Sequence, residues 1–294
     1  MSKITLVLSD KCYTSFDQPW IVDMVKDYFD ICYIEHDPII DRKALFVTNV
    51  LASEKQYNQN YKLIIDNLWE IPKEDNRGLV LTSKNWFWYN ESLWYQHLDY
   101  HEHEPNLNIQ KNGLLLMNLK KPHRDWLFEK LDLQKILYSY VGKGIKICND
   151  INQSSPEWQR YFNPIWYNST AFSIVAETGV SNDQQVFITE KTFKPIAFQH
   201  PFIVFGQQGV LTYLKTQGFE TFENVFDESY DDEYDVDKRL NNIVNQVNEY
   251  SYKSYDLYTI SKLKHNKELF FNQQLIKDRI IKEIVEPILE YAET

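Results

Sequence analysis

Short apolar runs alternate along the chain with segments whose apolar residues recur at helical spacing. In the first part, the runs have the length of buried strands and cover residues 4–8, 31–34, 44–47 and 78–81. Between the first two, residues 19–29 carry apolar side chains every three or four positions, which is the spacing of one helix face. Strands that alternate with helices predict an α/β domain with a largely parallel sheet.

The alternation restarts after a polar stretch at residues 106–112. Further strands are expected at residues 114–117, 136–141 and 172–176, and helices at residues 122–131 and 210–217. A broad apolar stripe then marks a C-terminal helix: Leu275, Ile276, Ile280, Ile284, Val285, Ile288 and Leu289. We therefore predict an α/β domain over residues 1–111, a second over 112–272, and a C-terminal helix over 273–294 that packs back.

Composition narrows the class of protein. Of the 294 residues, 43% are hydrophobic and 25% charged, which is typical of globular chains. A net charge of -11 argues against a broad nucleic-acid footprint, so a nucleic-acid partner is not expected. The three cysteines are far apart and form no CxxC pair, as expected in a reducing compartment. No apolar run approaches the about 20 residues of a membrane span, and the chain enters a strand directly, so we expect a cytoplasmic protein.

Several catalytic motifs are missing from the sequence. It contains no GxGxxG fingerprint, no Walker loop and no GxSxG nucleophile elbow. These absences disfavour a dinucleotide-dependent oxidoreductase, a P-loop kinase and a serine hydrolase.

The segment from 187 to 206 combines a helix start with a buried strand. Thr189 can cap the helix, Glu190 and Lys191 lie in its first turn, and Lys194 follows one turn later. Another helix start carries His123 and Arg124. If both helices leave the same edge of the sheet, Arg124 and Lys191 converge on one diphosphate, and Glu190 is free to accept ribose hydroxyls. The alternative is that these are solvated charges at helix ends.

The same residues carry a resemblance to a known family. Phe187-Ile-Thr-Glu-Lys191, preceded by Phe172-Ser-Ile-Val-Ala-Glu177, resembles the donor-site motif of the α1,3/α1,4-fucosyltransferases. Residues 114–131, with Asn118 and Arg124, are similar to the strand, loop and Arg-bearing helix that come earlier in that family. The likeness covers roughly residues 113–230. Thr178 stands where the family has Asn, Phe187 replaces its Tyr, and residues 218–231 look more like a divergent group of viral and bacterial glycosyltransferases.

The resemblance implies a GT-B fold, in which two Rossmann-like domains face a central cleft. It implies an inverting glycosyltransferase that needs no metal or cofactor, with the acceptor (a glycan or other hydroxyl compound) on the first domain and the donor on the second. Lys191 and Arg124 would hold the diphosphate, Glu190 the ribose, and Glu177 would lie near the nucleotide, with a GDP-sugar favoured over a UDP-sugar. Residues Thr189, Lys194 and His123 complete the expected donor site. A viral member would act in the host cytoplasm.

The family's catalytic base is a Glu on a loop after a strand of the first domain. Here Lys62-Leu-Ile-Ile-Asp66-Asn-Leu-Trp-Glu70 is the closest context, so Asp66 and Glu70 are the candidates. A helix-capping Asp66 and a surface Glu70 are the alternatives.

Other features leave two interpretations open. The aromatic run at 86–89, with Trp94 and Tyr95, forms either a sugar-stacking wall or part of the core. The His97, His101 and His103 group is either a metal site or a polar loop, and residues 227–237 either bind calcium or form a solvated loop. His200 is interpreted as a hydrogen-bonded turn residue.

Two other functions stay open. One is a catalytically inactive protein that binds carbohydrate or a partner on the same fold. The other is a viral glycosyltransferase acting on modified DNA bases, against which the net charge of -11 weighs.

Overall fold

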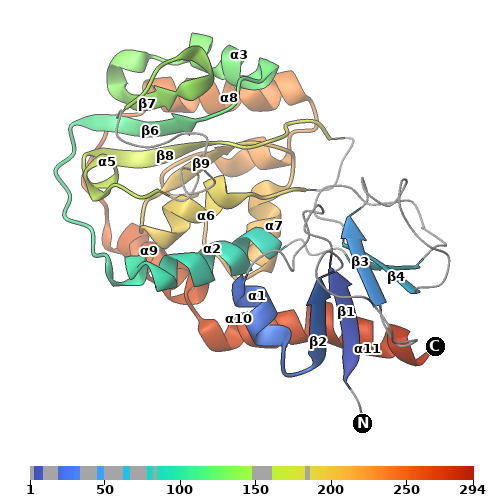
Figure 1. Cartoon of the computed structure of the whole chain (residues 1–294). Coiled ribbons are helices and arrows are strands. Elements are labelled where there is room, and N and C mark those ends of the chain that lie inside the picture. Colours follow the sequence, from blue (N-terminus) through green and yellow to red (C-terminus); the bar gives the residue numbers. More distant parts are fainter. Residues whose placement is uncertain are drawn as a thin grey trace. The chain divides into compact units, whose positions relative to one another are not determined.

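A computed structural model describes most of the chain (Figure 1). The described residues are 3–8, 19–33, 45–49, 62–66, 78–81, 85–147, 161–182 and 186–294. The chain divides into two compact units, the first comprising 1–93 with 272–294 and the second 94–271. This division falls inside a helix, whereas we had placed a boundary at 111/112. The C-terminal segment belongs to the first unit and is not a separate part.

The first unit contains a parallel sheet, as the alternation predicts. In its described part the strands are β1 (Ile4–Leu8), β2 (Phe29–Tyr33), β3 (Leu45–Asn49), β4 (Lys62–Asp66) and β5 (Gly78–Leu81). They follow the order β2-β1-β3-β4-β5, and every described pairing is parallel. The side chains of Leu6, Val7 and Leu8 are buried, which is typical of an inner strand covered on both faces.

Four α-helices belong, wholly or in part, to the described part of the first unit. They are α1 (Pro19–Val25), the first eight residues of α2 (Trp86–His97), α10 (Gln273–Ile280) and α11 (Glu286–Glu293). The predicted C-terminal stripe is confirmed by burial of Ile276, Ile280, Ile284, Val285 and Ile288. The segment is not one regular α-helix, because π turns at Ile281–Val285 separate α10 from α11. Pro287 follows directly and has no N–H to donate, which favours a shifted hydrogen-bond ladder at this point.

The aromatic run of α2 belongs to the core. Trp86, Trp88, Tyr89 and Tyr95 are all buried. For these four side chains the core interpretation is confirmed, and a sugar-stacking wall made of them is wrong.

The second unit also contains a parallel sheet. Its sheet has the order β7 (Ile136–Tyr140), β6 (Lys111–Met117), β8 (Thr170–Ala176) and β9 (Phe202–Phe205), and all the described pairings are parallel. Every residue of β8 is buried, as expected for the inner strand of a parallel sheet. Both units are therefore α/β with parallel sheets, which confirms the predicted fold class.

Helices accompany this sheet (Figure 1). In the described part they are α3 (Pro122–Lys130), α5 (Pro164–Asn168), α6 (Glu190–Ala197), α7 (Val210–Thr216), α8 (Val236–Glu249) and α9 (Leu257–Phe270). Short 3-10 turns occur at Tyr100–Glu102, Leu133–Lys135, Val141–Lys143 and Glu228–Asp232. Within the described residues, no helix is both long and apolar enough to cross a membrane.

The acidic segment at 227–237 is more than a solvated loop. Asp231 is buried, and its two carboxylate oxygens accept the backbone N–H groups of Leu211 (3.0 Å) and Thr212 (2.9 Å), which satisfies the start of α7. Asp227 caps the 3-10 turn and Asp235 caps α8. Three acidic side chains of residues 227–237 therefore accept N–H groups at the starts of helical segments.

Candidate donor-binding site

The site lies between β6 and β8 of the second unit, where successive strands are added on opposite sides of β6. From β6 the chain passes to β7 on one side, and it later enters β8 on the other side. The loops that leave β6 and β8 therefore diverge at the carboxyl edge of the sheet, which is where open α/β sheets bind ligands. A pocket occupies this place, lined by Met117, Asn118, Val175 and Ala176 from the two strand ends.

The pocket has a cavity volume of about 90 Å³. Whole small-molecule sites measure roughly 300–1,000 Å³, so this partly open pocket would hold part of a ligand of nucleotide size. Its inner wall is aromatic, with Tyr161, Trp166 and Tyr167, and carries the hydroxyls of Ser139 and Ser173. An apolar wall with a few polar groups is typical of a site that orients a planar or sugar-like ligand.

The first turn of α6 brings Glu190 and Lys191 to the pocket. Thr189 caps the helix as predicted, because its hydroxyl oxygen accepts the N–H of Lys191 (3.4 Å). The Lys191 ammonium donates to a Glu190 carboxylate oxygen (2.7 Å) and to the Thr189 hydroxyl oxygen (2.9 Å). Burial raises the pKa of Glu190, but the charge and hydrogen bond of Lys191 outweigh it, so the net shift is downward and the carboxylate is ionised.

Glu177, directly after β8, holds this helix start in place. Its carboxylate is fully buried and accepts four hydrogen bonds. The donors are the Thr189 N–H (3.0 Å), the Thr192 hydroxyl (2.7 Å), the Thr189 hydroxyl (2.6 Å) and the Thr178 N–H (3.2 Å). The Glu177 carboxylate therefore ties the end of β8 to α6 and is not among the residues that line the pocket.

Arg124 has a different environment from the one we expected. Its side chain is buried, and its guanidinium donates to the backbone carbonyls of Leu119 (3.1 Å), Ala176 (3.2 Å) and Glu177 (3.2 Å). Arg124 does not line the pocket, so it braces the two loops at the strand ends. Burial lowers the pKa of Arg124, while the charges of Glu177 and Glu190 act in the opposite direction.

His123 joins the same loop. Its Nε2 lies 3.1 Å from the carbonyl oxygen of Glu177. Burial lowers the pKa of His123, and the charges of Arg124 and Lys121 add to this effect. A neutral ring donates to the Glu177 carbonyl in that geometry, so His123 contributes a hydrogen bond and no positive charge.

Lys194 lines the pocket one turn after Lys191, as the helical spacing predicted. Its ammonium donates to the backbone carbonyl of Tyr161 (3.1 Å). Lys121 was missed by sequence reasoning. It is the N-cap residue of α3, and its ammonium donates to the carbonyl oxygen of Thr178 (2.8 Å). The signal for it was present, since Lys121 lies at the same helix start as His123 and Arg124.

The two base candidates, Asp66 and Glu70, belong to the first unit. Asp66 is the last residue of β4 in the first unit, so its backbone lies at the carboxyl edge of that sheet. Glu70 lies outside the described residues. Both stay predictions.

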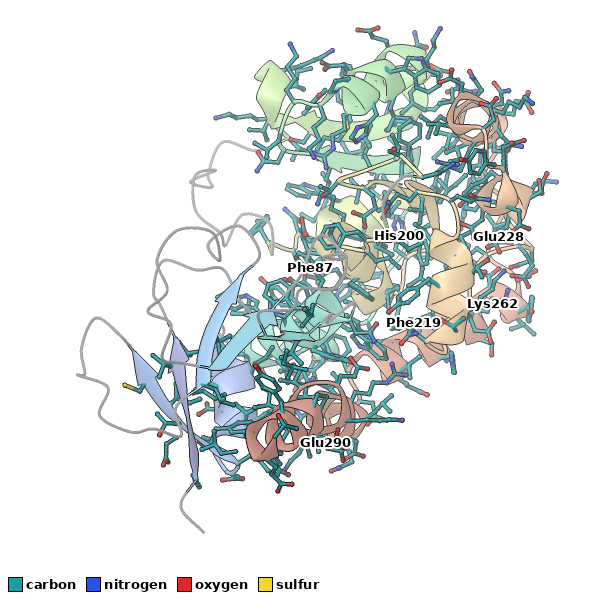
Figure 2. All side chains as sticks on the ribbon, turned by 90° about the vertical axis from the view of Figure 1, so that its right-hand side faces the viewer. Phe87, His200, Phe219, Glu228, Lys262 and Glu290 are labelled. Atoms are coloured by element: carbon teal, nitrogen blue, oxygen red, sulfur yellow. The ribbon has the colours of Figure 1, made fainter. Side chains whose placement is uncertain are left out.

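His200 and His103 do not line the pocket, and each packs against or hydrogen-bonds to neighbouring residues of the second unit. His200 is buried, with Nδ1 2.8 Å from the Ser173 hydroxyl and Nε2 2.8 Å from the Thr170 carbonyl, which confirms the hydrogen-bonded interpretation. Figure 2 shows His200 among the interior side chains of its unit. The His103 ring packs edge-on against Phe162 (4.7 Å between centroids). The part of the chain that the structure describes contains no group of three potential metal ligands.

Comparison with known proteins gives few relatives. Neither a protein-family model nor a curated protein sequence matches the chain. One solved structure, the crystal structure of an alpha1,3-fucosyltransferase, aligns over 93% of this chain and 92% of its own, at 10% identity and a TM-score of 0.41. Since a TM-score of this size does not establish a common fold, the α/β assignment rests on the two parallel sheets.

Proposed function

We propose that this protein is a glycosyltransferase that binds a nucleotide-diphosphate sugar at the carboxyl edge of the second unit. One observation carries the proposal: the pocket lies between the diverging ends of β6 and β8, and Glu190 and Lys191 line it from the start of α6. This placement agrees with the Thr-Glu-Lys motif, which is the most specific part of the resemblance to the fucosyltransferases.

The two first-turn residues suit two parts of the donor. Glu190 has an ionised carboxylate, which accepts hydrogen bonds from ribose hydroxyls. Lys191 carries an ammonium with three donors, which suits the diphosphate. Lys194 adds a second cation along the pocket wall. Glu177, Thr189, Arg124 and His123 hold the surrounding loops and act as positioning residues.

We propose that the transfer proceeds with inversion, as the resemblance to the fucosyltransferases implies. A base removes the proton of the acceptor hydroxyl, the hydroxyl oxygen attacks the anomeric carbon, and the bond to the diphosphate breaks with its electron pair. Ammonium groups beside the diphosphate stabilise the charge that develops on it, so no metal ion is needed. Asp66 and Glu70 remain the candidates for the base, and a GDP-sugar is the donor we would test first.

Thermal unfolding with added nucleotide tests the donor site. GDP, UDP and their sugar derivatives should raise the Tm of the wild-type protein, because a ligand that binds the folded state stabilises it. Lys191→Ala should abolish most of this rise. Lys264→Ala on α9 is the matched control, since it removes an exposed lysine of the same unit. A wild-type protein whose Tm responds to none of these nucleotides would refute the proposal.

Transfer itself needs a second measurement. Hydrolysis or transfer of a radiolabelled nucleotide sugar, in the presence of a glycan library, would separate an enzyme from an inactive binding protein. A protein that binds nucleotide but releases no nucleoside diphosphate with any sugar donor would favour the inactive alternative.

A further inference from the structure

Lys121 is a partly buried cation with unused hydrogen-bonding capacity. An ammonium group has three donors. In the described part of the chain, only the Thr178 carbonyl oxygen accepts one of them, at 2.8 Å, and no carboxylate forms an ion pair with Lys121. This is unusual in a chain with a net charge of -11, where acidic partners are plentiful.

Lys121 and Lys191 approach the same residue from different helix starts. The Lys191 ammonium lies 3.4 Å from the Thr178 hydroxyl oxygen, while the Lys121 ammonium lies 2.8 Å from the Thr178 carbonyl oxygen. Burial lowers the pKa of Lys121, and the charges of Arg124 and Lys191 lower it further. Lys191 forms an ion pair with Glu190 (2.7 Å), and the charges of Glu177 and Glu190 act on Arg124. Lys121, by contrast, forms no ion pair among the described residues, so a bound anion would supply the missing countercharge.

Arg124 is less accessible to such an anion than Lys121. Its side chain is only 2% exposed and its guanidinium faces three backbone carbonyls at the ends of β6 and β8, whereas Lys121 is partly exposed. Lys121, three residues earlier, keeps two donors without an acceptor among the described residues. The anion site is therefore built from Lys191, which lines the pocket, and Lys121, which does not line it but reaches the same Thr178. A bound anion would replace the Thr178 and Thr189 hydroxyls as acceptors of the Lys191 ammonium.

We propose that Lys121 and Lys191 together bind the diphosphate of the donor, one on each side of Thr178. This inference rests on the proposed glycosyltransferase function and assigns to Lys121 the contact that the sequence had suggested for Arg124. When the anomeric carbon–oxygen bond breaks, both of its electrons leave with the diphosphate. The two ammonium groups stabilise the resulting negative charge, and the acceptor's proton goes to the base.

Inorganic pyrophosphate is the probe that isolates this contact, because it carries the diphosphate without base or sugar. Its affinity is measured by calorimetry for the wild type, Lys121→Ala, Lys121→Gln and Lys191→Ala. Lys120→Ala is the matched control, since Lys120 is the exposed neighbour. Loss of one charge-assisted contact should weaken binding roughly tenfold to 100-fold in Lys121→Ala and Lys191→Ala. Lys120→Ala should stay within about twofold of the wild type, as expected for a solvated charge.

Lys121→Gln distinguishes loss of the positive charge from loss of the hydrogen bond to Thr178. Its amide N–H can still donate to the Thr178 carbonyl, so the loop is retained while the charge is lost. Weak binding by a glutamine variant whose Tm equals that of Lys120→Ala supports the inference. Wild-type-like pyrophosphate binding by both Lys121 variants overturns it.

The same measurements separate this inference from the proposed function. If the wild type binds neither pyrophosphate nor any nucleoside diphosphate, the proposed function fails and takes this inference with it. If the wild type binds and only the Lys121 variants are unaffected, the donor site stands and Lys121 has no part in it.

Discussion

Glu177 offers the sharpest test of how the start of α6 is held against the end of β8, and the test variant is Glu177→Gln. Each carboxylate oxygen accepts one backbone N–H, from Thr189 on Oε1 (3.0 Å) and from Thr178 on Oε2 (3.2 Å). A glutamine amide has one oxygen and one NH₂ group, and backbone N–H groups cannot turn to become acceptors. In either orientation, an NH₂ group therefore faces a backbone N–H inside a fully buried site.

The expected cost follows from these contacts. An unsatisfied buried donor costs about 1–3 kcal/mol, and the lost bonds to a charged acceptor are worth about as much again. We expect Glu177→Gln to lower the free energy of unfolding by about 3 kcal/mol. For a unit of this size each kcal/mol lowers Tm by about 2–4 °C, so the expected drop in Tm is about 6–12 °C.

Urea unfolding followed by circular dichroism measures this difference, with differential scanning fluorimetry as a second probe. Glu129→Gln on α3 is the control, because its carboxylate is 70% exposed and should change stability by less than about 0.5 kcal/mol. If Glu177→Gln unfolds within about 1 kcal/mol of the wild type, the four hydrogen bonds do not hold the start of α6 and the reasoning is refuted.

Two further predictions concern the same unit. A Cβ on Gly142 would lie 2.7 Å from the backbone N of Lys120, so Gly142→Ala should displace the loop after β6. This displacement should lower the free energy of unfolding by about 1–3 kcal/mol and weaken nucleotide binding. Gly179→Ala, which meets open space, is its control, and equal Tm values for the two variants would contradict the prediction. Burial lowers the pKa of His200 from 6.5 to about 4, so between these two pH values the unfolded chain binds a proton that the folded chain does not. The free energy of unfolding should therefore fall by about 3 kcal/mol as the pH drops from 6.5 to 4. NMR titration of the His200 ring should show no protonation above pH 5, and an ordinary midpoint near 6.5 would count against it.

Local signals were enough for much of this fold. Apolar runs predicted the described strands of both sheets except β4 (Lys62–Asp66), because a buried parallel strand must be apolar along its length. The cap at Thr189 and the first-turn residues Glu190 and Lys191 were also predictable, since helix capping depends on residues that are close in the sequence. The interruption of the C-terminal helix by π turns before Pro287 was not predictable, because a stripe of apolar residues does not show which backbone carbonyl each N–H group bonds.

Long-range contacts decided the rest. Lys121 and Arg124 stand three residues apart at one helix start, and nothing in that spacing shows which of the two side chains is buried. Arg124 is buried against the carbonyls of Ala176 and Glu177, some fifty positions later at the end of β8, whereas Lys121 stays partly exposed. The sequence by itself determined that cations and a carboxylate would gather at the carboxyl edge of a parallel sheet. Only the tertiary structure decided which of them line the pocket and which are buried, because the hydrogen-bond acceptors that hold the buried ones come from strands distant in the sequence.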